Sequence, residues 1–160
     1  MKSVAELGLI TGVAVVAGLG NWLASGRPSA DPVRELELVP LKDGEILLDQ
    51  ALKDGGEGLV WVDARPAEMW RKETIKGSIN ITMQADQALV DQLARHSDVL
   101  FEASRVIVFC DDVHCSVSHD LSERLKGEYR DFVAGEILVL HGGMTALRAT
   151  DLLTNSSPSP

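Results

Sequence analysis

The chain has 160 residues, which suits one domain of ordinary size with a further segment at either end. Hydrophobic residues make up 45% of it and aromatic residues only 4%, so the core must be mainly aliphatic. A formal net charge of −9 without a basic stripe argues against nucleic acid, and against anionic lipid as a partner of the folded part. Two cysteines cannot form a disulfide scaffold, and we expect no metal and no cofactor.

The N-terminal segment differs in composition from the rest of the chain. Residues Val4–Leu23 are nearly all apolar or small, and about 20 helical residues span the roughly 30 Å core of a bilayer. We interpret residues 1–26 as a single-pass transmembrane anchor, with Trp22 at the interface. The alternative is a secretory signal peptide cleaved near Ala24-Ser25-Gly26. The basic residues on the two sides of this segment nearly cancel as an orientation signal. We expect the soluble domain on the extracytoplasmic (periplasmic) side, and the anchor interpretation also implies membrane contact through the N-terminal helix.

A linker and two short elements follow in the sequence. Residues 27–34 contain two prolines and are expected to form a linker. A first strand is expected at Leu36–Val39, and a helix at Asp43–Lys53 that Gly55-Gly56 would end. Gly58–Asp63 is apolar on both faces, which predicts a buried strand.

Strands and helices alternate along the rest of the chain. The other expected strands are Ser78–Ile81, Arg105–Phe109 and Glu136–Leu140. The other expected helices are Pro66–Lys72, Gln84–Arg95, Val117–Lys126 and a last one from Gly142-Gly143 through Leu147. This order predicts an α/β fold over residues 35–150, with a mostly parallel central sheet flanked by helices on both faces. Residues 151–160 are expected to be a disordered tail.

Cys110 ends the most apolar of the predicted strands, and a short polar loop and a helix follow it. Reactive sites of parallel sheets lie at the carboxyl ends of the strands, where both Asp63 and Cys110 are expected. Backbone N–H groups at a helix N-terminus favour the thiolate, which is the reactive form of cysteine. Cys110 is therefore a candidate nucleophile; the alternative is a small apolar residue that only completes the strand.

Three segments of the sequence, in this order, resemble the rhodanese-like domain family, over a match that runs from Leu36 to Ala149. They are Val62-Asp63-Ala64-Arg65-Pro66-Ala67-Glu68-Met69-Trp70, Ile75-Lys76-Gly77-Ser78-Ile79-Asn80-Ile81, and Val106-Ile107-Val108-Phe109-Cys110 with the later Val139-Leu140-His141-Gly142-Gly143. With its N-terminal apolar segment, the chain is similar to a membrane-anchored single-domain rhodanese.

The resemblance implies a sulfurtransferase in which Cys110 takes sulfane sulfur from a small donor and becomes a persulfide. The persulfide would then pass its sulfur to a thiol or to another nucleophilic acceptor. The active-site loop implied by the resemblance comprises Asp111, Asp112, Val113, His114, Cys115 and Ser116.

Other polar residues near the predicted strand ends are expected to support this loop. Asp63 could accept loop N–H bonds or form an ordinary Asx-turn. Arg65 is interpreted as the partner of Glu68 or of another buried carboxylate, in preference to a substrate contact. His141 is expected to be a packed or hydrogen-bonded histidine, not a base.

The loop departs from the family pattern in its charge, because Asp111 and Asp112 are present and Arg, Lys and Gly are absent. Two carboxylates disfavour a neighbouring thiolate and repel an anionic donor such as thiosulfate, so a small persulfide or polysulfide is the expected donor. Two alternative functions remain open. One is a thiol redox protein in which Cys110 and Cys115 form a disulfide. The other is a non-catalytic rhodanese-fold module that binds a membrane-protein partner through its acidic loop.

Overall fold

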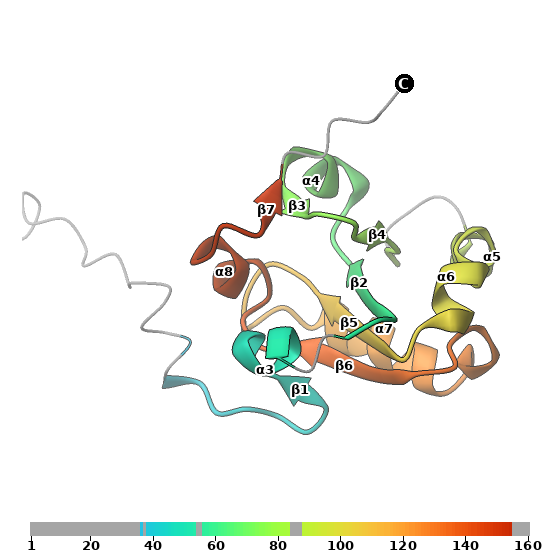
Figure 1. The fold of residues 1–160 in the computed structure, drawn as a ribbon, viewed down its shortest axis with the longest axis horizontal. Coiled ribbons are helices and arrows are strands. Elements are labelled where there is room, and N and C mark those ends of the chain that lie inside the picture. Colours follow the sequence, from blue (N-terminus) through green and yellow to red (C-terminus); the bar gives the residue numbers. More distant parts are fainter. Residues whose placement is uncertain (1–35, 37, 54–55, 84–87, 155–160) are drawn as a thin grey trace, which may run out of the picture. The chain divides into compact units, whose positions relative to one another are not determined.

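The computed structural model describes residues 36, 38–53, 56–83 and 88–154. Within these residues, five strands form one sheet in the order β1-β6-β5-β2-β4, and all neighbouring strands run parallel (Figure 1). The strands are β1 (Glu45–Ile46), β6 (Glu136–Leu140), β5 (Arg105–Phe109), β2 (Leu59–Asp63) and β4 (Ile79–Asn80). The predicted α/β fold with a mostly parallel central sheet is therefore confirmed.

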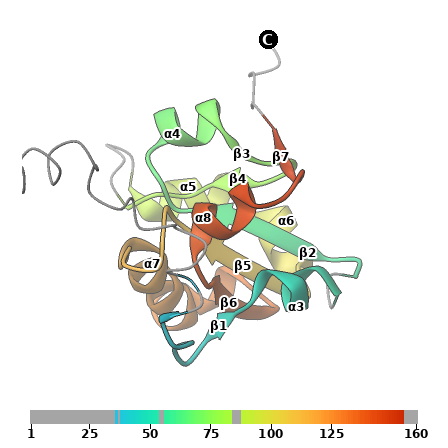
Figure 2. The same cartoon turned by 90° about the vertical axis from the view of Figure 1, so that its left-hand side faces the viewer.

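Helices pack against the sheet (Figures 1 and 2). Two separate hydrophobic clusters are buried between these elements. In β5, Val106 and Val108 pack with α5 (Leu89–Arg95), α6 (Ser97–Glu102) and α7 (Val117–Lys126). Ile107 and Phe109 pack with α3 (Leu48–Lys53) and α8 (Gly143–Arg148). Successive side chains of a strand point to opposite faces, so a central strand covered by helices must be apolar at every position.

The register of the sheet brings the predicted site residues to one edge. Asp63 at the end of β2 lies opposite Phe109 at the end of β5, so Cys110 follows directly beside it. The backbone N–H of Ala64 donates to the carbonyl of Phe109 at 2.9 Å, which extends the pairing by one residue. The carboxyl ends of β2 and β5 thus form the floor of the candidate site.

Two predictions about the first described residues are wrong. The strand expected at Leu36–Val39 is absent: Leu36 and Leu38 have helical backbone, and the side chain of Leu38 is 76% exposed. The segment Asp43–Lys53, expected to be one helix, forms strand β1 and then the shorter helix α3. Gly44 turns the chain at a φ of 79°, after which β1 pairs with β6, and this pairing overrides the helical spacing of the leucines.

A second, antiparallel pair joins β3 (Thr74–Ile75) to β7 (Leu153–Thr154) and was not predicted. It corrects the expectation that the tail 151–160 is disordered throughout, because the β3 edge provides a partner for Leu153 and Thr154. The helix expected over Gln84–Arg95 is described as α5 from Leu89 onward, after Ala88 with a non-helical ψ of 142°, while residues 84–87 lie outside the described part of the chain. The prediction also missed α6 and the 3₁₀ turn η1 (Arg130–Phe132), whereas it located α7 and α4 (Ala67–Lys72) correctly.

Among the described residues, no helix is both long enough and apolar enough to cross a membrane. The anchor predicted within residues 1–26 and the linker predicted at residues 27–34 lie outside the described part of the chain.

Candidate functional site

Asp63 and Arg65 form a buried ion pair at the end of β2. Arg65 Nη2 lies 2.7 Å from Asp63 Oδ2, and its Nε donates to Asp63 Oδ1 at 3.0 Å. Asp63 Oδ1 also accepts the backbone N–H of Arg65 at 3.0 Å, which forms the Asx-turn that the sequence left as an alternative. Arg65 thus pairs with a buried carboxylate other than Glu68, which is the second of the two kinds of partner expected from the sequence.

The same guanidinium reaches two further groups. Arg65 Nη2 donates to the carbonyl of Glu73 at 2.6 Å, and Nη1 lies 3.5 Å from Asp111 Oδ1. Burial disfavours the charge of Arg65, but its hydrogen bonds and charge interactions with Asp63 and Asp111 outweigh this effect and raise its pKa. Arg65 is therefore a permanent buried cation that connects the end of β2 to the loop after β5.

Hydroxyl and amide side chains hold the segment between β2 and β4 around this ion pair. Thr74 Oγ1 donates to Asp63 Oδ2 at 3.0 Å and lies 2.8 Å from Ser78 Oγ. Asn80 donates from Nδ2 to the carbonyls of Asp63 and Arg65, each at 2.8 Å. Every oxygen of Asp63 thus has a donor, which a buried carboxylate requires.

Cys110 is 2% exposed and lies where β5 ends. Its carbonyl accepts the backbone N–H of Met144 at 2.8 Å, and the carbonyl of Asp111 accepts that of Thr145 at 3.0 Å. The first turn of α8 approaches so closely because Gly143 has no side chain: a Cβ there would overlap the Cys110 carbonyl oxygen. Gly142 and Gly143 both have positive φ, at 78° and 49°, which other residues rarely adopt.

The loop after Cys110 turns back on itself. Asp112 Oδ1 accepts the backbone N–H of His114 at 2.8 Å, and the carbonyl of Asp112 accepts that of Cys115 at 3.3 Å. This turn brings Cys115 to Cys110, and the two form a disulfide with their Cα atoms 6.4 Å apart. The structure therefore contains the pair that the sequence left as an alternative.

The remaining loop residues differ in exposure. Val113 is buried in the core, while Asp112, His114 and Ser116 are exposed. Ser116 is the N-cap of α7 but makes no side-chain capping bond. None of these three exposed side chains lines the cavity beside the cysteines.

A cavity of about 370 Å³ adjoins the disulfide. It is lined by Ala64, Arg65, Pro66, Glu68, Met69, Cys110, Asp111, Cys115 and Val117. The cavity combines sulfur, a buried cation and an apolar wall, a combination that can hold a small sulfur compound close to Cys110.

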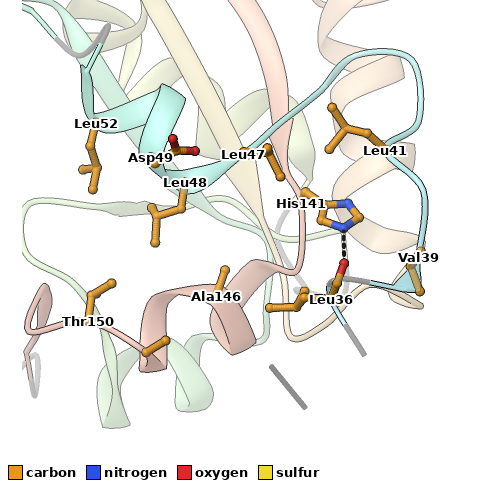
Figure 3. A pocket seen from close by; sticks show the side chains of 11 residues that line it. Leu36, Val39, Leu41, Leu47, Leu48, Asp49, Leu52, His141, Ala146 and Thr150 are labelled. Carbon is orange, nitrogen blue, oxygen red and sulfur yellow. Dashed lines mark hydrogen bonds between the residues drawn. The ribbon is translucent and has the colours of Figure 1, made fainter. Parts of the chain in front are cut away.

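A larger cavity of about 730 Å³ lies elsewhere, between α3, α8 and the segment that begins at Leu36 (Figure 3). Its lining is mostly leucine and alanine, with His141 at one end, and contains neither cysteine nor Arg65. We place the candidate site at the smaller cavity, because the larger one presents no thiol.

His141 belongs to a second buried group, which we call the histidine cluster: Glu45, His119 and His141. Glu45 Oε2 lies 2.8 Å from His141 Nδ1, and Oε1 lies 2.8 Å from His119 Nε2. Burial raises the pKa of Glu45, but the backbone N–H of Lys42 and both histidines outweigh it, so the net shift is downward. His141 is thus a hydrogen-bonded histidine, as expected, whereas no pattern in the sequence indicates its partner Glu45.

Comparison with known proteins places this chain in a family. Residues 47–150 match the family model for the rhodanese-like domain. No curated protein sequence matches the chain.

Solved structures with the same fold come from several organisms. An As-Sb reductase from Leishmania major has a TM-score of 0.54 and 17% identity, over 68% of this chain and 83% of its own. A Saccharomyces cerevisiae homolog of single-domain rhodanese and the Cdc25 phosphatase catalytic domain has a TM-score of 0.52 and 15% identity, over 71% and 88%. Thiosulfate sulfurtransferase from Pseudomonas aeruginosa has a TM-score of 0.50 and 21% identity, over 74% of this chain but only 21% of its own. At these identities the likeness establishes the fold alone.

Proposed function

Because this chain belongs to the rhodanese-like domain family, we propose that it is a sulfurtransferase that carries sulfane sulfur as a persulfide on Cys110. The observation that supports this most is the position of Cys110. It is buried at the carboxyl end of β5 and lines a cavity together with Arg65. A nucleophile at such a strand end, beside a cavity, suits transfer of a small group.

The reaction requires the reduced form of the protein. The Cys110 thiolate attacks the outer sulfur of a persulfide R–S–SH, a new S–S bond forms at Cys110, and R–S⁻ leaves. The proton stays on the transferred sulfur. A nucleophilic acceptor, such as a thiol, then takes that sulfur and regenerates Cys110 as a thiolate.

The charges around the cavity support a small persulfide or polysulfide as donor, in preference to thiosulfate. Arg65 is already paired with Asp63 and shares its remaining nitrogen with Asp111. Little positive charge is therefore left for a dianion, and the exposed Asp112 adds repulsion at the loop. Thiosulfate sulfurtransfer is the activity named for the Pseudomonas aeruginosa protein, which shares only the fold with this chain.

The disulfide favours a second candidate function, a thiol–disulfide redox protein. In that case Cys110 and Cys115 would exchange electrons with a partner dithiol, and no sulfur would be carried. The two candidates differ in one measurable product, the persulfide on Cys110.

We further propose, from the sequence alone, that residues Val4–Leu23 tether the domain to a membrane on its extracytoplasmic side. A membrane-protein partner would be a natural acceptor or donor there. Fractionation of the full chain tests this: extraction by detergent but not by carbonate or salt is the expected result, and release by carbonate would contradict it.

The test of sulfur carriage uses the fully reduced protein and its Cys115→Ser variant, in which a persulfide cannot be lost to a second cysteine. Each is incubated with inorganic polysulfide under anaerobic conditions, desalted and weighed intact. We expect Cys115→Ser to gain the mass of one sulfur atom, and Cys110→Ser to gain none. Absence of an adduct on Cys115→Ser would overturn the proposal.

A further inference from the structure

We infer that Cys115 is the resolving thiol of this site: it attacks the Cys110 persulfide and releases the carried sulfur as hydrosulfide. The inference rests on the proposed function and specifies its second half. The final electron donor would then be a dithiol reductant, and hydrosulfide would be the product.

The first support is reach. The two sulfur atoms are bonded, and the 6.4 Å between the Cα atoms lies within the usual disulfide range of about 4.4–6.8 Å. Cys115 can therefore attack the inner sulfur of a persulfide on Cys110 from within its own loop. The turn at Asp112, whose carboxylate and carbonyl accept the N–H groups of His114 and Cys115, holds the loop in the form that allows this.

The second support is the difference in exposure between the two cysteine residues. Cys110 is 2% exposed, whereas Cys115 is only partly buried at the edge of the core. An external dithiol reaches Cys115 more easily, and attack there expels Cys110 as a thiolate. That is the form in which Cys110 must start the next reaction.

The disulfide has little to add to the stability of this region. A short closed loop constrains the unfolded chain less than a long one does. The end of β5 is already fixed by the backbone bond from Met144 to Cys110, and α7 is anchored by Leu121 and Leu125 in the core. A catalytic role explains the position of Cys115 better than a structural one.

The steps balance as follows. The Cys115 thiolate attacks the inner sulfur of Cys110–S–SH, the disulfide forms, and HS⁻ leaves with the terminal sulfur. The two cysteine sulfurs together lose two electrons, and the sulfane sulfur gains them and becomes sulfide. A dithiol reductant then reduces the disulfide to two thiols and is itself oxidised to a disulfide.

The experiment loads the reduced protein with glutathione persulfide under anaerobic conditions and omits any reductant. Hydrosulfide is trapped with an alkylating reagent over time, and the protein is weighed intact at each point. Wild type is compared with Cys115→Ser and Cys110→Ser, and a sample without donor controls for direct oxidation. We expect wild type to release one hydrosulfide per molecule and to form the disulfide. Cys115→Ser should keep its sulfur and release hydrosulfide at least about 100-fold more slowly, because it lacks the intramolecular thiol.

The other outcomes separate the two proposals. If wild type keeps its extra sulfur as long as Cys115→Ser does, the resolving role is overturned and sulfur carriage stands. If neither protein gains sulfur and no hydrosulfide depends on the protein, both fail. If wild type forms the disulfide and hydrosulfide, while Cys115→Ser gains the mass of glutathione and not that of one sulfur atom, Cys110 attacks the inner sulfur of the donor and HS⁻ leaves at that step; both proposals then fail and the redox function is left.

Discussion

Two buried polar groups at the same edge of the sheet can be compared directly: the thiol site, made of Asp63, Arg65, Cys110 and Cys115, and the histidine cluster. Each is organised around a buried carboxylate that two or more donors surround. In the thiol site the principal partner is a permanent cation, and sulfur and a cavity lie beside it. In the histidine cluster the partners are imidazole rings, and their hydrogen bonds to Glu45 connect β1 with α7 and with the residue after β6.

The difference shows that a buried ion pair is not by itself a sign of chemistry. Asp63 and Arg65 satisfy each other and fix a turn, as Glu45 and its histidines do. The thiol site has in addition a nucleophile with open space next to it. If this comparison is right, changes in the first group alter the loop and its chemistry, whereas changes in the histidine cluster alter stability alone.

The largest expected effect is that of Asp63→Ala. This change leaves Arg65 buried without its closest partner, and breaking such a pair from one side costs about 3–5 kcal/mol. Urea unfolding of the domain measures it. The control is Arg148→Ala, which removes the much more exposed pair with Glu73 and should cost less than about 1 kcal/mol. Equal losses in the two variants would contradict a special role for Asp63.

Gly143→Ala should cost about 2–4 kcal/mol, because it combines an unfavourable positive φ with overlap at the Cys110 carbonyl. It should also lower the yield of persulfide on Cys110. Gly77→Ala is a matched control: its φ is 82°, but an added Cβ meets no atom within 4 Å, so it reports the backbone strain alone. If Gly77→Ala lowers the persulfide yield as much as Gly143→Ala does, the close approach of α8 to Cys110 is not what supports persulfide formation.

Glu45→Gln tests the histidine cluster through pH. The pKa of Glu45 is lowered from 4.5 in the folded state, so its ionisation stabilises the fold above that value. This contribution disappears as pH falls through the lowered pKa. We expect the variant to be about 1–2 kcal/mol less stable than wild type at pH 7, and the gap to close in acid. A gap that stays constant between neutral and acidic pH would refute the assignment, whereas an unchanged persulfide yield is the expected control.

The smallest effect is expected from Asp111→Asn. It removes a carboxylate near Arg65 and the cysteines, and should raise the rate of persulfide formation by polysulfide up to about fivefold. Stopped-flow measurement at two ionic strengths checks this, because added salt should shrink the gain. Asp49→Asn on α3 makes the same change in net charge away from the loop. A similar gain in that variant would mean that only net charge matters.

Much of the fold followed from the sequence because local pattern and tertiary context agree there. The apolar run Arg105–Phe109 is buried on both faces in the way that the pattern predicts, and the helix Val117–Lys126 has the predicted bounds. The local sequence pattern and the tertiary structure disagree at Leu36–Val39 and in the first part of Asp43–Lys53. In the second segment, the spacing of the leucines fits a helix. Glu45 and Ile46 form a strand there because their backbone pairs with the outer edge of β6.

The candidate site was predicted in part for a similar reason. Asp63 and Cys110 each end an apolar strand, so the rule for parallel sheets places them together. Glu45 and His119 are far apart in the chain and had no pattern that could join them to His141. Gly143 could have been identified as more than a turn residue only from the closeness of α8 to Cys110.

The sequence by itself determined the α/β class with a mostly parallel sheet, the family resemblance and the location of both cysteines in one acidic loop. These features depend on local composition and spacing, which a single chain displays directly. Only the tertiary structure decided that Arg65 pairs with Asp63 and Asp111, and that Cys115 bonds to Cys110 beside a cavity. Such contacts depend on how a loop turns and on which buried group finds a partner, and packing fixes both.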